Sequence, residues 1–342
     1  MEAIYNFTEK DLKDKLTSNG FPGYTGRQVF EWVYKKRVSN FDSMSNLSKK
    51  LKEFLRKSFS ITKLKLIKKE KSTDKTEKYL FELEDGMAIE AVLIPEKERS
   101  TLCVSTQVGC KFKCLFCVSG QDGFKRNLTA SEIIGQYFAV ADLKAPLKVT
   151  NIVFMGIGEP LDNFDNTIKS INILMNSAGI NFSKRRISIS TCGLVPEIKE
   201  LAKLKLGIKL SVSLHSAEND IRDKLMPINK KYPIEELMLA TREFSKVSKD
   251  LVTFECVLIE GINTSVDDAR KLAKLLNRVN GKANLIPYNG SSPEIKAPTQ
   301  EQLDIFTQEL KDRSAFFTLR KSRGQDINAA CGQLKVKYLL DQ

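Results

Sequence analysis

Three cysteines stand within eight residues and constrain what this chain can build. Cys110, Cys114 and Cys117 follow a C-x₃-C-x₂-C spacing. Thiolates this close in sequence are spaced to wrap a single metal centre. A 4Fe–4S cluster usually takes four cysteines, and a structural zinc also takes four protein ligands, but the only histidine, His215, lies far downstream. The spacing favours an iron–sulfur cubane with one iron left open to a small molecule. Zinc or plain buried thiols are the alternatives.

Size and composition indicate an ordinary globular protein. The chain has 342 residues, of which 42% are hydrophobic and 28% charged, enough for one large domain and a small one. Its N-terminus lacks the apolar core of a signal peptide, and no apolar run approaches the ~18 residues of a membrane helix. Seven cysteines in such a chain indicate metal or redox chemistry rather than a disulfide framework. We expect a cytoplasmic monomer with no membrane partner.

The positive charge is concentrated at the N-terminus. Residues 1–70 hold 16 lysines and arginines against 8 aspartates and glutamates, which gives +8 of the net charge of +13. A basic lobe beside a nearly balanced remainder is typical of a protein that binds a polyanion. A solvated lysine-rich surface is the alternative.

The first 95 residues divide into two parts. Apolar residues recur at helical spacing through residues 1–60, which predicts a small basic helical domain. From Lys63 the pattern changes to period two, and Asp85-Gly86 stands between two alternating runs at residues 79–83 and 87–94. This pattern predicts a β-hairpin connector over residues 61–95.

Beyond the hairpin, predicted strands and helices alternate through residues 96–342. The expected strands are 100–107, 149–155, 186–190, 208–214, 251–259 and 282–288, and the expected helices are 129–144, 165–178, 196–206, 234–248, 265–276 and 299–312. This alternation predicts an α/β fold with a parallel sheet, arranged as a partial (βα)₆ barrel. The chemistry of such barrels lies at the carboxyl ends of the strands, and the cysteine run follows the first strand.

A glycine-rich turn follows the second predicted strand. Its residues are Met155-Gly156-Ile157-Gly158-Glu159-Pro160, and Leu161 stands where a dinucleotide-binding fingerprint needs a third glycine. A tight strand-to-loop turn explains this run equally well. Together with the cysteine run, however, the order of elements resembles the radical S-adenosylmethionine (SAM) superfamily. The resemblance implies a radical SAM barrel, a 4Fe–4S cluster on the three cysteines, and SAM bound through Gly158 and Glu159.

Further motifs resemble the RlmN and Cfr branch of that superfamily, whose members methylate adenine in RNA. The residues that carry this resemblance are Cys103, Cys331 in Ala330-Cys331-Gly332, Glu90 in Ile89-Glu90-Ala91-Val92, Ser190, Ser213-Leu214-His215 and Asn289 in Pro287-Tyr288-Asn289. Pro160 and the run from Leu285 to Asn289 are more similar to RlmN, which acts on carbon 2, than to Cfr, which acts on carbon 8. Ile157 and Val118-Ser119 depart from the usual motif residues without touching an assigned role.

The resemblance implies roles for the motif residues. Ser190, Ser213, Leu214, His215 and Asn289 contact SAM in this interpretation. Cys331 carries the methyl group as S-methylcysteine, Glu90 acts as the base, and Cys103 resolves the adduct through a transient disulfide with Cys331.

The target carbon explains why a radical is needed. Carbon 2 of adenine and the methyl carbon of SAM are both electron-poor, so direct polar transfer should fail. The resemblance implies that SAM is cleaved by one electron to a 5′-deoxyadenosyl radical, and that two SAM are consumed per methyl transferred. The implied substrates are 23S rRNA and the adenine beside the anticodon in tRNA. The implied partner is an external flavodoxin-like or ferredoxin-like electron donor.

Each residue also has an interpretation without catalysis. Glu90 could lie on the solvent side of the hairpin, and Cys103, Cys331 and His215 occur in contexts that packing alone explains. Cys192 and Cys256 are interpreted as packing residues. RNA phosphates are expected to meet the basic lobe through Lys35, Lys36, Arg37, Lys49, Lys50 and Lys52. Arg320 and Arg323 steer phosphate toward Cys331 or belong to a solvated tail. The rival class is a non-catalytic RNA-binding protein with a structural metal.

Overall fold

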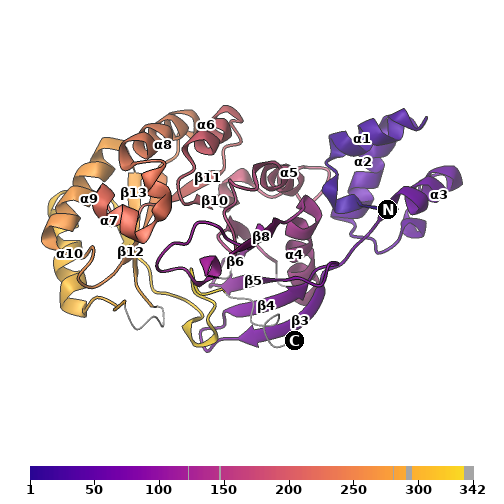
Figure 1. Ribbon diagram of the computed structural model, residues 1–342. Helices are drawn as coiled ribbons and strands as arrows, with labels where there is room; N and C mark the ends of the chain where they lie inside the picture. Colours follow the sequence, from indigo (N-terminus) through magenta and orange to yellow (C-terminus); the bar gives the residue numbers. More distant parts are fainter. Residues whose placement is uncertain (122, 146–147, 280, 290–294, 335–342) are drawn as a thin grey trace.

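One curved sheet, which has ten strands within the described residues, organises the molecule (Figure 1). The structure, a computed structural model, describes residues 1–121, 123–145, 148–279, 281–289 and 295–334. Among the described residues, six neighbouring strands pair in parallel, and β14 (Phe317–Leu319) adds a short parallel edge strand after the last of the six. The six are β6 (Ser100–Cys103), β9 (Asn151–Phe154), β10 (Ile187–Thr191), β11 (Lys209–Ser213), β12 (Val252–Leu258) and β13 (Gly281–Pro287). The predicted partial barrel is confirmed.

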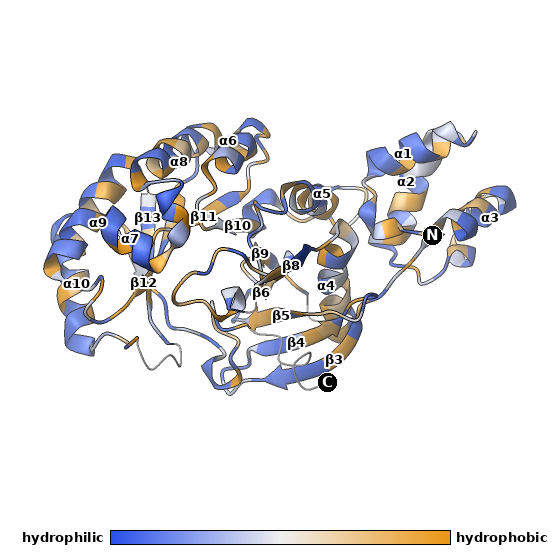
Figure 2. Ribbon diagram, viewed as in Figure 1, coloured by the Kyte–Doolittle hydropathy of each residue, from blue (hydrophilic) through white to orange (hydrophobic). Residues whose placement is uncertain are grey.

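Helices cover the outer side of the parallel strands (Figure 1). They are α4 (Ala130–Leu143), α5 (Phe164–Met175), α6 (Val195–Lys203), α8 (Ile234–Ser248), α9 (Val266–Val279) and α10 (Gln300–Asp312). The short helix α7 (Asn219–Leu225) lies instead at the carboxyl ends of β10 and β11, where Arg222 donates to the carbonyl oxygens of Cys192 and Ser213. Thr129 begins α4 with a capping box, which satisfies backbone donors at the helix start. In α9 the residues Ala269, Leu272, Ala273 and Leu276 are buried, a spacing of three and four that gives the helix one apolar face. Hydrophilic residues occupy its other side (Figure 2).

Three antiparallel strands extend the sheet beyond β6. They are β3 (Lys65–Lys71), β4 (Glu77–Glu82) and β5 (Ala88–Pro95). Gly86 turns the chain between β4 and β5 with a φ of +80°, a conformation that favours glycine. Val92 of β5 lies opposite Cys103 of β6. The predicted hairpin is therefore continuous with the sheet of the barrel. It joins the barrel through the pairing of β5 with β6, the first parallel strand.

The N-terminal residues form a helical lobe beside α4 (Figure 1). Its elements are β1 (Glu2–Ala3), α1 (Glu9–Ser18), α2 (Tyr24–Phe30), a π-helical turn (Glu31–Lys35), α3 (Lys49–Ser58) and β2 (Phe59–Ser60). The pairing of β1 with β2 brings the two ends of the lobe together. The ring of Tyr5 lies 4.9 Å from the ring of Phe138 on α4, so the lobe packs against the barrel. The domain boundaries stay a prediction. No helix within the described residues could span a membrane.

The segment that carries Cys331 connects the two edges of the sheet. Residues 320–334 follow β14 (Phe317–Leu319), the edge strand beyond β13, and return toward β3 and β4 (Figure 1). Asp326 accepts hydrogen bonds from the hydroxyl of Ser72 at 2.6 Å and from the backbone N–H of Thr73 at 3.0 Å. Because Ser72 and Thr73 belong to the β3–β4 turn, these hydrogen bonds anchor the segment near the β3 edge of the sheet. Cys331 is thereby held between the two edges of the sheet.

Candidate active site

The three cysteines of the motif lie on a loop framed by two short strands. These strands are β7 (Gln107–Gly109) and β8 (Phe124–Asn127), which pair antiparallel. Gly109 has a φ of +74°, and a side chain there would overlap the carbonyl oxygen of Gly123. The strand predicted over 100–107 therefore ends earlier, at Cys103, because the chain leaves the main sheet to form this loop.

Cys110, Cys114 and Cys117 all line one large cavity. Its empty volume is about 950 Å³ with its mouth included, which is the size of a site for a cofactor-sized molecule. Burial raises the pKa of the Cys110 thiol to about 12 and also raises the pKa values of Cys114 and Cys117. Thiolates in this setting therefore need a cationic group beside them. Within the described residues, no three histidine, cysteine or acidic side chains lie close enough together to hold a single metal ion.

The turn after β9 forms another wall of this cavity. A side chain at Gly156 or Gly158 would collide with the segment that follows β6, so the close approach requires glycine at both positions. The carboxylate of Glu159 lines the cavity and accepts hydrogen bonds from the backbone N–H groups of Leu161 at 3.0 Å and Cys192 at 2.7 Å. Burial raises the pKa of Glu159. Glu159 thus joins the carboxyl ends of β9 and β10 at the wall of the cavity.

His215 places a buried donor in the cavity wall. The backbone N–H of Val257 donates to its Nδ1 at 3.0 Å, so in the neutral ring the proton is on Nε2. Nε2 is buried and has no partner among the described residues. Burial, helped by the charge of Arg222, lowers the pKa of His215 to about 3. His215 is therefore a neutral ring whose N–H group is available to an acceptor on a bound molecule.

The other predicted SAM contacts separate into two groups. Ser190 and Ser213, at the ends of β10 and β11, line the cavity. Leu214 is fully buried in the hydrophobic core. Asn289 is not among the lining residues, and its backbone carbonyl accepts a hydrogen bond from the side chain of Gln333 at 2.5 Å. The roles of Leu214 and Asn289 as SAM contacts stay predictions.

Glu255 is a cavity residue that the sequence analysis missed. It lies on β12, lines the cavity, and accepts a hydrogen bond from the side chain of Asn284 at 2.6 Å. Burial raises the pKa of Glu255. A charged residue between Phe254 and Cys256 in an otherwise apolar predicted strand was the available signal, because a lone carboxylate inside a buried strand needs a polar reason to be there.

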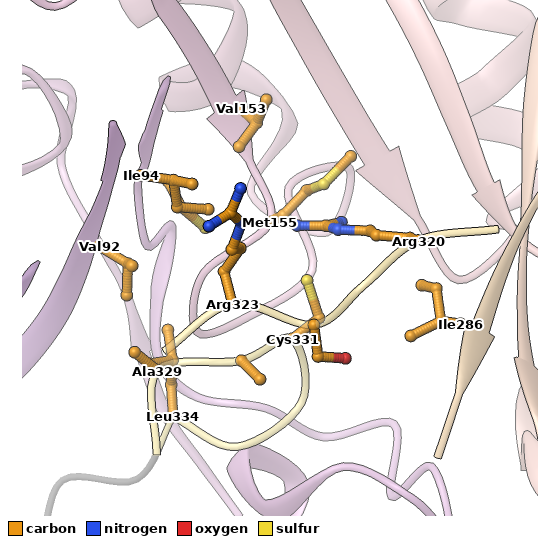
Figure 3. A pocket seen from close by; sticks show the side chains of 13 residues that line it. Val92, Ile94, Val153, Met155, Ile286, Arg320, Arg323, Ala329, Cys331 and Leu334 are labelled. Carbon is orange, nitrogen blue, oxygen red and sulfur yellow. The ribbon is translucent and has the colours of Figure 1, made fainter. Parts of the chain in front are cut away.

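A second, smaller cavity adjoins the first. Its empty volume is about 500 Å³, and Val92, Cys103 and Val153 form its wall on the face of the sheet. Figure 3 shows Cys331 and Arg320 pointing into it from the C-terminal segment. Cys331 lines both cavities, so it stands at the junction between the motif cysteines and Cys103. Burial, with a smaller effect of Cys331, raises the pKa of Cys103 to about 12.

Arg320 and Arg323 differ in their surroundings. Arg320 is half-buried and lines both cavities, and the neighbouring sulfur of Cys331 raises the pKa of Arg320. Arg323 lines only the smaller cavity and is exposed. For Arg320 the interpretation as part of a solvated tail is wrong, because its guanidinium group lies against the thiol of Cys331.

Glu90 is buried, so the interpretation as a solvent-facing carboxylate is wrong. It is 4% exposed and lies on the same strand face as Val92 and Ile94, which line the smaller cavity. Its carboxylate forms an ion pair with Lys78, with 3.4 Å between Oε1 and Nζ. Glu90 itself is not among the residues that line either cavity, and its role as a base stays a prediction.

Comparisons with known proteins place this arrangement in a family. Residues 104–276 match the model of the Radical SAM superfamily, and residues 3–61 match the model described as the ribosomal RNA large subunit methyltransferase N-terminal domain. A probable dual-specificity RNA methyltransferase RlmN from Thermotoga sp. (strain RQ2) is 44% identical over 340 residues, which cover 99% of each chain. The chain belongs to the RlmN family. The protein of that name from Spiroplasma citri is 43% identical over 339 residues, with 98% of each chain covered.

The fold agrees with that of a solved radical SAM methyltransferase. The crystal structure of a radical SAM methyltransferase from Sphaerobacter thermophilus superposes with a TM-score of 0.90 at 42% identity, covering 98% of this chain and 99% of that one. As a member of the RlmN family of radical SAM RNA methyltransferases, the chain uses a 4Fe–4S cluster and SAM. Three thiols and an unpartnered buried N–H group around one cavity fit these two groups.

Proposed function

We propose that this protein methylates carbon 2 of an adenine in 23S rRNA and of the adenine beside the anticodon in tRNA. The observation that carries the proposal is the place of Cys331, which lines both the cavity of the three motif cysteines and the cavity of Cys103. A methyl carrier must first receive a methyl group beside SAM and then be resolved by a second thiol. The names of the relatives, dual-specificity RNA methyltransferases, support RNA as the substrate class.

Cys110, Cys114 and Cys117 would hold the cluster, and SAM would occupy the rest of the larger cavity. Gly158 and Glu159 are proposed to receive the methionyl amino group, because the glycine leaves room and the carboxylate attracts a cation. The Nε2–H of His215 and the hydroxyls of Ser190 and Ser213 supply further polar contacts. When bound, the cluster and SAM together supply one electron and an alkyl radical that removes a hydrogen atom from a methyl group.

Cys331 begins the reaction as a nucleophile. Its thiolate attacks the methyl carbon of one SAM, so a sulfur–carbon bond forms at Cys331 while the sulfonium bond breaks and S-adenosylhomocysteine leaves. Arg320 lies beside this sulfur, and Cys331 raises the pKa of Arg320. After hydrogen removal from the S-methyl group, the resulting carbon radical adds to carbon 2 of the adenine and tethers the RNA to Cys331.

Resolution of the tethered RNA uses Glu90 and Cys103. The adduct is a radical, so it gives one electron to the oxidised form of the external one-electron carrier and loses the proton of carbon 2, which Glu90 is proposed to accept, and the ring becomes aromatic again. The thiolate of Cys103 then attacks the sulfur of Cys331. The sulfur–carbon bond breaks, the carbon leaves with the electron pair and takes a proton, and a disulfide remains. An external donor supplies two electrons to reduce this disulfide and one electron for SAM cleavage.

The basic lobe is proposed to bind RNA phosphates without reading sequence. Lys35, Lys36, Lys49 and Lys50 are exposed on it. Arg37 is less available, because its guanidinium group pairs with Asp142 of α4. The target adenine must leave its stack to reach the cavities, so a loop base is the expected substrate.

The proposal is tested by anaerobic reconstitution of the protein with iron, sulfide, SAM, a reductant and an rRNA fragment, followed by mass spectrometry of the digested nucleosides. We expect 2-methyladenosine, one S-adenosylhomocysteine and one 5′-deoxyadenosine per methyl, and brown protein with the absorbance of a cubane. Formation of 8-methyladenosine would place the enzyme with the carbon-8 methyltransferases. Colourless zinc protein without SAM cleavage would identify a non-catalytic RNA-binding protein.

A further inference from the structure

Lys78 and Glu90 form a buried ion pair on the face of the sheet that carries Cys103. Lys78 lies opposite Val92 in the β4–β5 pairing, and Val92 lies opposite Cys103 in the β5–β6 pairing. Directly opposed residues share a face, so Lys78, Val92 and Cys103 form one row across three strands. Glu90 lies opposite Leu80 in the adjacent row, which makes Lys78 and Glu90 diagonal neighbours.

Both members of the pair are almost withdrawn from water. The side chain of Lys78 is 10% exposed and that of Glu90 is 5% exposed, with 3.4 Å between Nζ and Oε1. On its other side the Nζ of Lys78 lies 3.2 Å from a carboxylate oxygen of Glu70, on the edge strand β3. Glu70 therefore holds the ammonium group between two carboxylates.

A buried carboxylate without a cation favours its neutral form, because burial penalises charge. A neutral carboxyl group has no free lone pair of sufficient basicity to take a proton from carbon. The lysine beside Glu90 thus favours the ionised form, which is the form able to act as a base. In a site with little water, the attraction to a cation this close also orients the carboxylate.

We propose that Lys78 is a positioning residue that keeps Glu90 ionised and oriented for removal of the carbon 2 proton. The inference rests on the proposed function, since it needs the tethered RNA intermediate. In the step concerned, the bond between carbon 2 and hydrogen breaks, its electron pair restores the aromatic ring, and the proton binds a carboxylate oxygen of Glu90. Lys78 touches neither the RNA nor SAM in this scheme and acts through Glu90.

The opposite face of the same strands offers a matched control. The carboxylate of Glu77 is 5% exposed and lies 3.0 Å from the Nζ of Lys144, at the end of α4. Alternation along β4 directs Glu77 away from the face of Lys78 and Cys103. Replacing Lys144 removes one cation from an equally buried carboxylate, which keeps Lys69 at 3.3 Å, and it does not alter either cavity.

The experiment compares the reconstituted full-length variants Lys78→Met, Lys78→Arg, Lys144→Met and Glu90→Gln. Each is incubated with SAM, reductant and the rRNA fragment, and protein–RNA cross-links, 5′-deoxyadenosine and 2-methyladenosine are measured. For Lys78→Met we expect normal methylation of Cys331, accumulation of cross-linked RNA, and product formation lower by roughly 100-fold, the scale of a lost general base. Lys78→Arg should restore most of the product, and Lys144→Met should match the unmodified protein.

Several results would overturn the inference. If Lys78→Met releases product at the normal rate, Lys78 has only a structural role. The same conclusion follows if Lys78→Met and Lys144→Met slow all steps equally. Lys78→Gln serves as a second neutral variant if the methionine variant loses its cluster on purification. If Glu90→Gln accumulates cross-linked RNA and Lys78→Met does not, only the role of Lys78 fails. If Glu90→Gln also fails to accumulate it, the base proposed for the reaction is wrong.

Discussion

The backbone N–H of Val118 donates a hydrogen bond to the carbonyl oxygen of Gly332 at 2.7 Å. This bond joins the residue after the third motif cysteine to the residue after Cys331. A second bond runs parallel to it, from the hydroxyl of Ser119 to the carbonyl oxygen of Leu334 at 2.7 Å. The loop of the motif cysteines therefore holds the C-terminal segment directly. The position of Cys331 depends on these two hydrogen bonds.

A methyl group at Gly332 should disturb Cys331 without removing any chemical group. Gly332 has a φ of +79°, and an added Cβ would lie 3.3 Å from the carbonyl oxygen of Phe116. We expect Gly332→Ala to slow methylation of Cys331 by about tenfold, the effect of roughly 1–2 kcal/mol of backbone strain. Intact-protein mass after reaction with SAM measures it. Gly261→Ala is the control, because Gly261 has a φ of +70° with open space around it. Equal slowing in both variants would contradict the prediction.

The hydrogen bonds between Asp326 and the β3–β4 turn should also help to hold Cys331 in position. Asp326→Ala removes the acceptor of Ser72 and Thr73, which are hydrogen bonds of about 1 kcal/mol each. We expect faster proteolytic cleavage near residue 326 and slower methylation of Cys331, with unchanged iron content. Timed proteolysis and intact mass report the two effects. The exposed Asp312, which only accepts a bond from Gln308, supplies the control Asp312→Ala. If the C-terminal segment of Asp326→Ala resists proteolysis as well as that of the unmodified protein, the role of Asp326 is contradicted.

Local patterns in the sequence predicted most of the fold. The helix predicted over 234–248 is α8 with the same bounds, because its apolar residues keep one period from end to end. The strand β3 was not predicted, since its Lys-rich residues face solvent on a sheet edge and carry little apolar alternation. The three-cysteine motif predicted where the cavity lies, because its residues are adjacent in sequence. Lys78 escaped notice because only the pairing of β4 with β5 brings it beside Glu90. Glu255 escaped notice because its one signal was a single carboxylate in a predicted strand.

The two cysteines at the smaller cavity should fail at different steps. Cys331→Ala is expected to abolish RNA methylation, because no other thiol lies at the junction of the two cavities. Cys103→Ala should still form the tethered intermediate and accumulate cross-linked RNA. Denaturing gels of labelled RNA separate the two results. Cys256→Ala is the control, since Cys256 is buried in the core and lines neither cavity. Methylation by the Cys331 variant would refute the methyl-carrier role.

The histidine donor can be removed with little cost to folding. His215 has a φ of +60°, which asparagine tolerates better than most residues, and the asparagine oxygen can replace Nδ1 as acceptor for Val257. We expect His215→Asn to keep its stability and to bind SAM about tenfold more weakly, the loss of one hydrogen bond to a bound molecule. Equilibrium binding of SAM to the reconstituted protein measures this. Unchanged affinity would show that Nε2–H does not face SAM.

The same variant tests the protonation state of His215 through stability. Because the pKa of His215 falls from 6.5 to about 3 on folding, the unfolded chain takes up a proton below pH 6.5 that the folded chain refuses. The stabilisation is therefore complete above pH 6.5 and is lost as the pH falls from 6.5 toward 3, by about 1.4 kcal/mol per pH unit. Between pH 7 and pH 5 the unmodified protein should lose about 2 kcal/mol more than His215→Asn. Urea unfolding of the two cluster-free proteins at both pH values gives this difference. His215 is the only histidine in the chain, so no other imidazole contributes to it. Equal losses in the two proteins would mean that the folded ring is protonated at pH 5.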